Sequence, residues 1–180
     1  MSKNLREFIQ KMKHSPLRNY AGIPGLTSWA IGGMSAPGAG MVRMMECSRE
    51  HHENIIPHSH RFDLHCIVLA GSVRNVLWKP SVIGDEYSST AMHANSAGVY
   101  TMLEHGKDRP MKWQAEEKLY SENDEYHMKA REVHSIYFSR GAVVLFFEGP
   151  QVSEESIILE PVVDGEVIPT FKVEPWMFKP

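Results

Sequence analysis

The spacing of apolar residues changes once along the chain, close to the N-terminus. Leu5, Phe8, Ile9 and Met12 recur at helical spacing between charged residues, which predicts a short amphipathic helix over Asn4–His14. Residues 15–40 are rich in Gly, Pro, Ala and Ser, a composition that interrupts helices and strands and predicts a long loop or arm. We therefore divide the chain into an N-terminal helix and arm, residues 1–40, and a β domain, residues 41–180.

The β domain consists of short apolar runs separated by turn residues. These runs predict strands at Met41–Cys47, Asn54–His60, His65–Leu69, Val73–Lys79, Val99–Leu103, Met111–Ala115, Val133–Phe138, Ala142–Phe147, Ile157–Val163 and Glu166–Val173. Asp164–Gly165 predicts a type I′ hairpin between the last two runs. Because no helix is predicted between the runs, the expected fold class is all-β, an antiparallel jelly-roll barrel or sandwich.

The charge balance narrows the range of partners. The 180 residues contain 19 Lys and Arg against 22 Asp and Glu, so we expect neither a nucleic-acid nor a membrane partner. The longest apolar run, Ala142–Phe147, is far too short to cross a membrane, and the N-terminus has no apolar signal core. Cys47 and Cys66 form neither a CxxC pair nor a disulfide framework. These features favour a cytoplasmic protein.

The histidines supply the candidate chemistry because they are clustered. His51, His52, His58, His60 and His65 fall in one short stretch. His58 and His60 are two residues apart on a predicted strand, where alternation places both side chains on one face. Two neutral imidazoles on one face can bind the same metal ion.

His134 is the third element of this pattern. It lies within the apolar run Val133–Phe138, where an imidazole without a partner would be costly. It is either a core histidine bonded to a backbone carbonyl or a third metal ligand from a strand that is distant in sequence and adjacent in the barrel. Because His134 accompanies the pair His58 and His60, we favour the metal site.

The two histidine segments resemble the two motifs of the cupin superfamily. His58-Ser59-His60, followed by Arg61–His65, an apolar strand and Gly71, resembles the first motif. Glu132-Val133-His134, followed by Ser139–Gly141 and Ala142–Phe147, resembles the second. The resemblance covers about residues 54–150 and implies a cupin-like jelly roll. The usual first motif carries a Glu after the histidine pair, and the nearest positions here are His65 and Asp63.

Without that Glu, the site resembles the three-histidine centre of cysteine dioxygenase and related thiol dioxygenases. This resemblance implies a divalent transition metal, Fe(II), held by His58, His60 and His134, with His65 as a further metal residue. Whether His65 or Asp63 approaches the metal is left open by the pattern. Cys66 would stand where some members carry a cysteine beside the site, whereas the Tyr expected near residues 145–150 is absent.

Three neutral ligands leave a divalent ion with its full charge, so its open positions favour anionic ligands. Arg43, on the strand before the histidine pair, is a candidate clamp for a substrate carboxylate or phosphate, with a surface arginine as the alternative. Tyr137, close to His134, is a candidate acid, with a wall residue as the alternative.

These features together predict a non-heme iron dioxygenase-type oxidoreductase that acts on a small anionic molecule. Two alternatives stay open: a non-catalytic barrel that binds a nucleotide or a sugar, and a sugar isomerase or lyase of the cupin type. The arm over residues 15–40 and the apolar residues Trp176, Met177 and Phe178 near the C-terminus favour a homodimer.

Overall fold

The computed structural model describes residues 3, 4, 7, 11, 16, 17, 25–33, 40–49, 56–94, 100–102 and 109–168. Its strands are β1 (Pro16–Leu17), β2 (Leu26–Gly33), β3 (Met41–Cys47), β4 (Phe62–Ala70), β5 (Ser72–Ala94), β6 (Tyr100–Met102), β7 (Met111–Ser121), β8 (Glu125–Met128), β9 (Val133–Phe138), β10 (Val143–Gln151), β11 (Glu155–Val163) and β12 (Glu166–Val167). The prediction of an all-β fold is confirmed.

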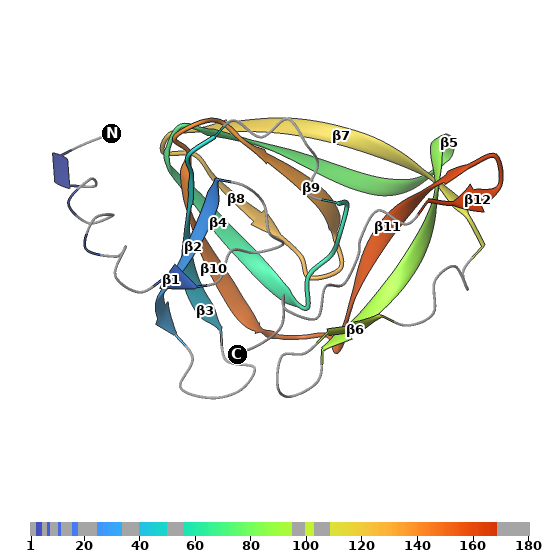
Figure 1. The fold of residues 1–180 in the computed structure, drawn as a ribbon, viewed down its shortest axis with the longest axis horizontal. Helices are drawn as coiled ribbons and strands as arrows, with labels where there is room; N and C mark the ends of the chain where they lie inside the picture. Colours follow the sequence, from blue (N-terminus) through green and yellow to red (C-terminus); the bar gives the residue numbers. More distant parts are fainter. Residues whose placement is uncertain are drawn as a thin grey trace.

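The strands form two antiparallel sheets. The first sheet has the order β1-β2-β3-β10-β4-β8, and the second has the order β12-β11-β5-β6, with β7 and β9 also paired to β5. In Figure 1 the first sheet lies on the left, while β11 and the later part of β5 form the right-hand side. The antiparallel sandwich that the sequence predicts is therefore present.

Several strands differ from the predicted runs. β3 and β9 have the predicted bounds, whereas β5 is 23 residues long and continues through a bulge between Pro80 and Asp85. Gly84 permits this bulge, because its φ is +111° and a Cβ there would lie 2.1 Å from the Trp113 carbonyl oxygen. β8 was not predicted, since its short sequence is half polar.

The arm predicted over residues 15–40 contains sheet structure, which corrects that prediction. β2 pairs with β3 from Leu26 opposite Cys47 to Gly33 opposite Met41. The residues of β2 alternate, although Gly32 and Gly33 at its end make this hard to see: Leu26 and Ser28 face the main core, and Trp29 is buried on the opposite face of the sheet against Met44 and Val143. Of the predicted N-terminal helix, Asn4, Glu7 and Lys11 are described and are helical; its other residues lie outside the described ones, as does the C-terminal run that ends the chain.

The main apolar core lies between the two sheets. It is built from alternating positions on strands of both sheets, among them Leu64, Cys66, Val68, Ile136, Phe138, Val144 and Phe146. Because alternation sends the intervening residues to the outer faces, this core fixes which side chains point into the barrel. The type I′ prediction for Asp164–Gly165 is supported by their φ values of +53° and +83° between paired Val163 and Glu166.

Within the described residues, no helix has the length and apolar character that a membrane crossing requires.

Candidate metal centre

A short extended segment around the histidine pair closes the barrel between β9 and β11. The backbone of His58 exchanges two hydrogen bonds with that of His134, at 2.8 and 2.9 Å. On the other side, Ser59 N–H donates to the Ile157 carbonyl at 2.8 Å, and Ile157 N–H donates to the Ser59 hydroxyl oxygen at 2.9 Å. The sequence predicted a full strand here, whereas the segment forms only isolated bridges. These bridges keep it extended, so successive side chains still alternate: His58 and His60 face the interior, and Ser59 faces β11.

The side chains of His58, His60 and His134 converge from this segment and from β9. Each offers one ring nitrogen, and these nitrogens lie within 4.8 Å of one another. The His60 and His134 Nε2 atoms are 3.0 Å apart, and the ring centroids are separated by 4.8 to 5.1 Å. In the part of the chain that the structure describes, no other set of His, Cys, Asp and Glu side chains is arranged in this way.

Two of the rings are oriented by a hydrogen bond at their other nitrogen. His134 Nδ1 lies 2.7 Å from the side-chain oxygen of Asn75, whose amide NH2 donates to the Met128 sulfur at 3.7 Å. His58 Nδ1 lies 2.8 Å from the Ile56 carbonyl oxygen. Because both partners are acceptors, each Nδ1 carries the proton and each Nε2 has a lone pair. His60 Nε2–H then donates to His134 Nε2 in the metal-free arrangement.

Burial keeps these imidazoles neutral. It lowers the pKa of His58, and it lowers the pKa values of His60 and His134 far below the usual range, where repulsion from the neighbouring histidines adds to the effect. The positive charge of Arg43 further lowers the pKa of His60. A neutral imidazole is the form that binds a metal ion, so the site is already in its ligating state near neutral pH.

The charge of Arg43 acts on one of the three histidines, His60. Its Nε is 2.6 Å from an oxygen of Glu148, and both side chains are largely buried. They come from neighbouring strands, since Arg43 is opposite Phe146 and Glu148 is opposite Met41. Burial raises the pKa of Glu148, and the charges of Arg43 and Arg61 oppose that rise. The structure thus places a guanidinium on the side of the site that faces β3.

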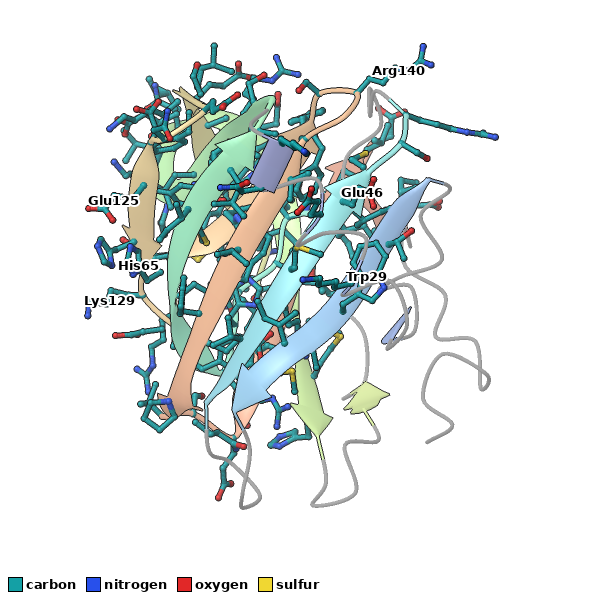
Figure 2. The ribbon with its side chains drawn as sticks, turned by 90° about the vertical axis from the view of Figure 1, so that its left-hand side faces the viewer. Trp29, Glu46, His65, Glu125, Lys129 and Arg140 are labelled. Carbon is teal, nitrogen blue, oxygen red and sulfur yellow. The ribbon has the colours of Figure 1, made fainter. Side chains whose placement is uncertain are left out.

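His65 does not join the three histidines. In β4 the inward positions are Leu64 and Cys66, so His65 and Asp63 both point to the outer face. His65 Nε2 is 2.9 Å from Glu125, and the His65 ring stacks on His127 at 4.2 Å. Figure 2 shows His65, Glu125 and Lys129 together at the β8 edge of the sheet.

Asp63 has a structural role at the same edge. Its carboxylate accepts from Lys129 Nζ at 2.7 Å and from Ala130 N–H at 2.9 Å, while the Ala130 carbonyl accepts from His60 N–H. Neither Asp63 nor His65, the two residues between which the sequence pattern left the choice open, lies with the three converging histidines. Leu64 is the inward residue between Asp63 and His65, which leaves the site without a carboxylate from this strand.

Tyr137 also lies away from the three histidines. It alternates with His134 and Ile136 on β9, so it faces the outer side, where the Arg74 guanidinium lies 4.1 Å above its ring. Cys66 is buried in the apolar core beside Tyr126, and burial raises the pKa of its thiol to about 12. A thiol in that state is a poor nucleophile and a poor metal ligand at neutral pH.

Asn75 is a site residue that the sequence did not single out. Its signal was present, because it is a polar residue at an inward position of the apolar run that begins at Val73. A buried amide needs a partner, as a buried histidine does. That shared need could have linked Asn75 to His134, but the strand register that places them together is not visible in the sequence.

The chain was compared with protein families, curated proteins and solved structures. No family model matches the chain, and a search of curated proteins gives no significant match. Similar solved structures include KdgF from Halomonas sp., with 13% identity and a TM-score of 0.45 over 77% of this chain and 91% of that one. They also include an RmlC-like cupin from Shewanella frigidimarina, with 12% identity and a TM-score of 0.40 over 72% and 79%. The CENP-C cupin domain of Drosophila melanogaster is 9% identical, with a TM-score of 0.44 over 83% and 100%.

These likenesses concern the fold alone. The described strands form an antiparallel β-sandwich with a three-histidine group inside it, which is the architecture that the two histidine motifs predict.

Proposed function

We propose that the protein is a metal-dependent oxidoreductase of the non-heme iron dioxygenase type, with a small anionic substrate. The observation that carries the proposal is the convergence of three neutral imidazoles, with ligand atoms within 4.8 Å of one another. Without a cation, two Nε2 atoms at 3.0 Å must share one proton, and a metal ion could bind to both nitrogens with the His60 proton on Nδ1 instead. The donor set therefore fits a divalent transition metal.

His58, His60 and His134 would hold the ion. Their arrangement comes from two regions that are distant in sequence, and the reciprocal backbone bonds between His58 and His134 fix it. A bound iron ion supplies open coordination positions and redox chemistry with dioxygen. The protein supplies the orientation of the ligands through Asn75 and the Ile56 carbonyl, so little reorganisation accompanies metal binding.

Arg43 is the residue that we propose for binding the anionic group of the substrate. It is largely buried, its charge acts on His60, and it forms an ion pair with Glu148. A guanidinium held in this way binds a carboxylate more strongly than an exposed arginine does. The proposed orientation of the substrate has its anionic group toward β3 and its reacting group toward the metal.

Metal analysis of protein purified without a histidine tag tests the proposal first. After anaerobic loading with Fe(II) and desalting, we expect about one equivalent of iron per chain, because three histidines form a complete ligand set for one ion. Oxygen uptake in the presence of small carboxylates is then expected for the iron-loaded form only. A stoichiometry below about a tenth of an equivalent for every transition metal tested would contradict the metal site.

A second candidate, a barrel that binds a small molecule without catalysis, is favoured by one observation. The proposed acid Tyr137 lies on the outer face, so no tyrosine of the described strand β9 serves the site. Ligand binding to the metal-loaded protein without oxygen uptake, across the same panel of carboxylates, would support this candidate over the oxidoreductase.

We also propose a cytoplasmic location and a homodimer. Cys47 and Cys66 are both free thiols in the buried core, which suits a reducing compartment. Light scattering on the purified protein measures the oligomeric state directly.

A further inference from the structure

Two of the three histidines, His58 and His134, have an uncharged hydrogen-bond partner at Nδ1, the ring nitrogen that faces away from the cluster. His134 Nδ1 is bonded to the neutral amide of Asn75, and His58 Nδ1 to a backbone carbonyl. Metal-ligating histidines often donate to a carboxylate instead, which makes the imidazole more basic and lowers the effective charge of the metal. In this protein the partner of His134 is the amide counterpart of such a carboxylate.

Carboxylates do face the interior, and each has another partner. Glu148 forms an ion pair with Arg43, with an oxygen 2.6 Å from Nε, and Glu160 accepts a hydrogen bond from Thr90 at 2.9 Å. The inward position of β4 that follows the histidine pair is Leu64. The charged group whose effect reaches His60 from outside the cluster is therefore a cation, Arg43.

The Asn75 side chain is held in one orientation. It is 7% exposed, its NH2 group points to the Met128 sulfur, and its oxygen points to His134. Its position opposite Ile136 on the neighbouring strand places it next to His134 without any contribution from a loop. This amide is thus a fixed part of the barrel wall and sets both the tautomer and the ring direction of His134.

From this arrangement we infer that Asn75 is a positioning residue that also sets the ligand preference of the centre, keeping the metal charge undiminished so that the substrate binds to the metal as an anion. This inference rests on the proposed metal site. A neutral amide orients His134 as well as a carboxylate would, but it adds no charge that would repel an incoming anion or weaken its attraction to the metal.

The test compares Asn75→Asp with Asn75→Leu in cobalt-loaded protein. Asn75→Asp retains the hydrogen bond and adds one negative charge, so we expect metal affinity to rise and azide affinity to fall by roughly tenfold. Asn75→Leu removes the hydrogen bond without adding charge, so we expect metal affinity to fall by about 10–100-fold while azide affinity at the remaining bound cobalt stays within about threefold of the wild type. Chelator competition measures the first quantity, and the visible spectrum of cobalt measures the second.

Asn123→Asp is the matched control. Asn123 lies in the turn before β8 with φ +76°, a conformation that Asp also adopts, and the substitution changes the net charge by the same amount at an exposed position. It should leave both affinities unchanged. Equal azide affinity in Asn75→Asp and the wild type, or an equal loss in Asn123→Asp, would overturn the inference.

The outcomes separate the two proposals. Absence of metal binding in the wild type contradicts the proposed function, whereas metal binding with unchanged azide affinity in Asn75→Asp contradicts only the role of Asn75. If Asn75→Asp does not fold, formate and its neutral isostere formamide decide the question on wild-type protein. The inference then requires formate to bind the cobalt-loaded centre at least roughly tenfold more tightly than formamide, and comparable binding of the two overturns it.

Discussion

Two groups of histidines lie on opposite faces of the barrel wall, and the contrast between them separates a metal site from a surface contact. The inner cluster, His58, His60 and His134, directs its ring nitrogens to one point. The outer pair, His65 and His127, stacks its rings nearly parallel at 4.2 Å and bonds to Glu125 at 2.9 Å. The two outer rings contact each other through their faces. In the inner cluster, by contrast, three ring nitrogens lie close enough together to bind one cation or to share a proton.

The sequence spacing of these residues does not distinguish the two groups. His65 is close enough to His60 in the sequence to be read as a metal ligand. However, it lies between the inward-facing residues Leu64 and Cys66, so its side chain points to the outer face. One residue of register decides whether an imidazole meets the metal or the solvent. The hydrogen-bond partners also differ, because His58 and His134 are oriented by neutral acceptors and His65 by an exposed carboxylate.

The comparison predicts its largest effect for loss of an inner ligand. His134→Leu removes the buried ring at similar volume, and we expect the metal affinity to fall by at least about 100-fold, since a complete ligand is lost rather than an orienting partner. Chelator competition followed by elemental analysis measures the change. His65→Leu is the matched control on the outer face and should bind metal as the wild type does. Equal losses in both variants would remove the distinction between the two groups.

The pH dependence of stability should come from the inner cluster. The folded-state pKa values of His58, His60 and His134 lie below their unfolded values, so the unfolded chain takes up protons first as the pH falls below about 6.5. The free energy of unfolding of the metal-free protein should therefore fall from about pH 6.5 downward, by at most about 1.4 kcal/mol per pH unit for each histidine. Urea denaturation between about pH 7.5 and 5 measures this slope.

A variant with all three inner histidines changed to Gln serves as the control for that slope. It should be nearly flat in the same interval, because the carboxylates with lowered pKa, such as Asp63, respond at lower pH. An unchanged slope in this variant would assign the pH dependence to other groups. Metal loading should shift the onset of the loss to lower pH, since the ion competes with protons for the same nitrogens.

A smaller effect is expected from Arg43. Arg43→Met paired with Glu148→Gln removes the guanidinium without leaving a buried carboxylate alone. We expect small carboxylates to bind the metal-loaded protein roughly tenfold more weakly, whereas metal affinity should stay the same or rise as the charge that acts on His60 is lost. Calorimetric titration with formate or acetate measures the first change. Arg74→Met, which removes an arginine from the outer face beside Tyr137, is the control.

Much of the fold was predictable because alternation survives in this sequence. β3 and β9 have the bounds that their apolar runs predict, and Asp164–Gly165 forms the turn that its sequence favours. β2 was not predicted, because Gly32 and Gly33 at its end resemble loop residues and its pairing with β3 is a tertiary property. The full length of β5 was not predicted, because Pro80 and Gly84 are residues that usually end strands. In this strand they occupy a bulge.

The candidate site could be predicted only as far as single strands allow. The spacing of His58 and His60 places them on one face whatever the rest of the chain does, and His134 stands out as a polar residue in an apolar run. The choice between Asp63 and His65 depended on the register after Arg61, and the structure directs both to the outer face. Asn75 and Glu148 required the pairing of strands, which local patterns do not encode.

The smallest effect is expected for the outer pair, His65 and His127. Its size sets an upper limit on how much an ordered imidazole on the outer face contributes to the free energy of unfolding. Glu125→Gln removes the charge that faces His65, and because both side chains are substantially exposed we expect the free energy of unfolding to fall by about 0.5 kcal/mol or less. The loss should shrink further in about 0.5 M salt, which screens exposed pairs. Urea denaturation measures this loss, and metal stoichiometry should stay at the wild-type value. A loss of metal in Glu125→Gln would mean that the two faces are coupled through β4, and the separation between the inner cluster and the outer pair would no longer hold.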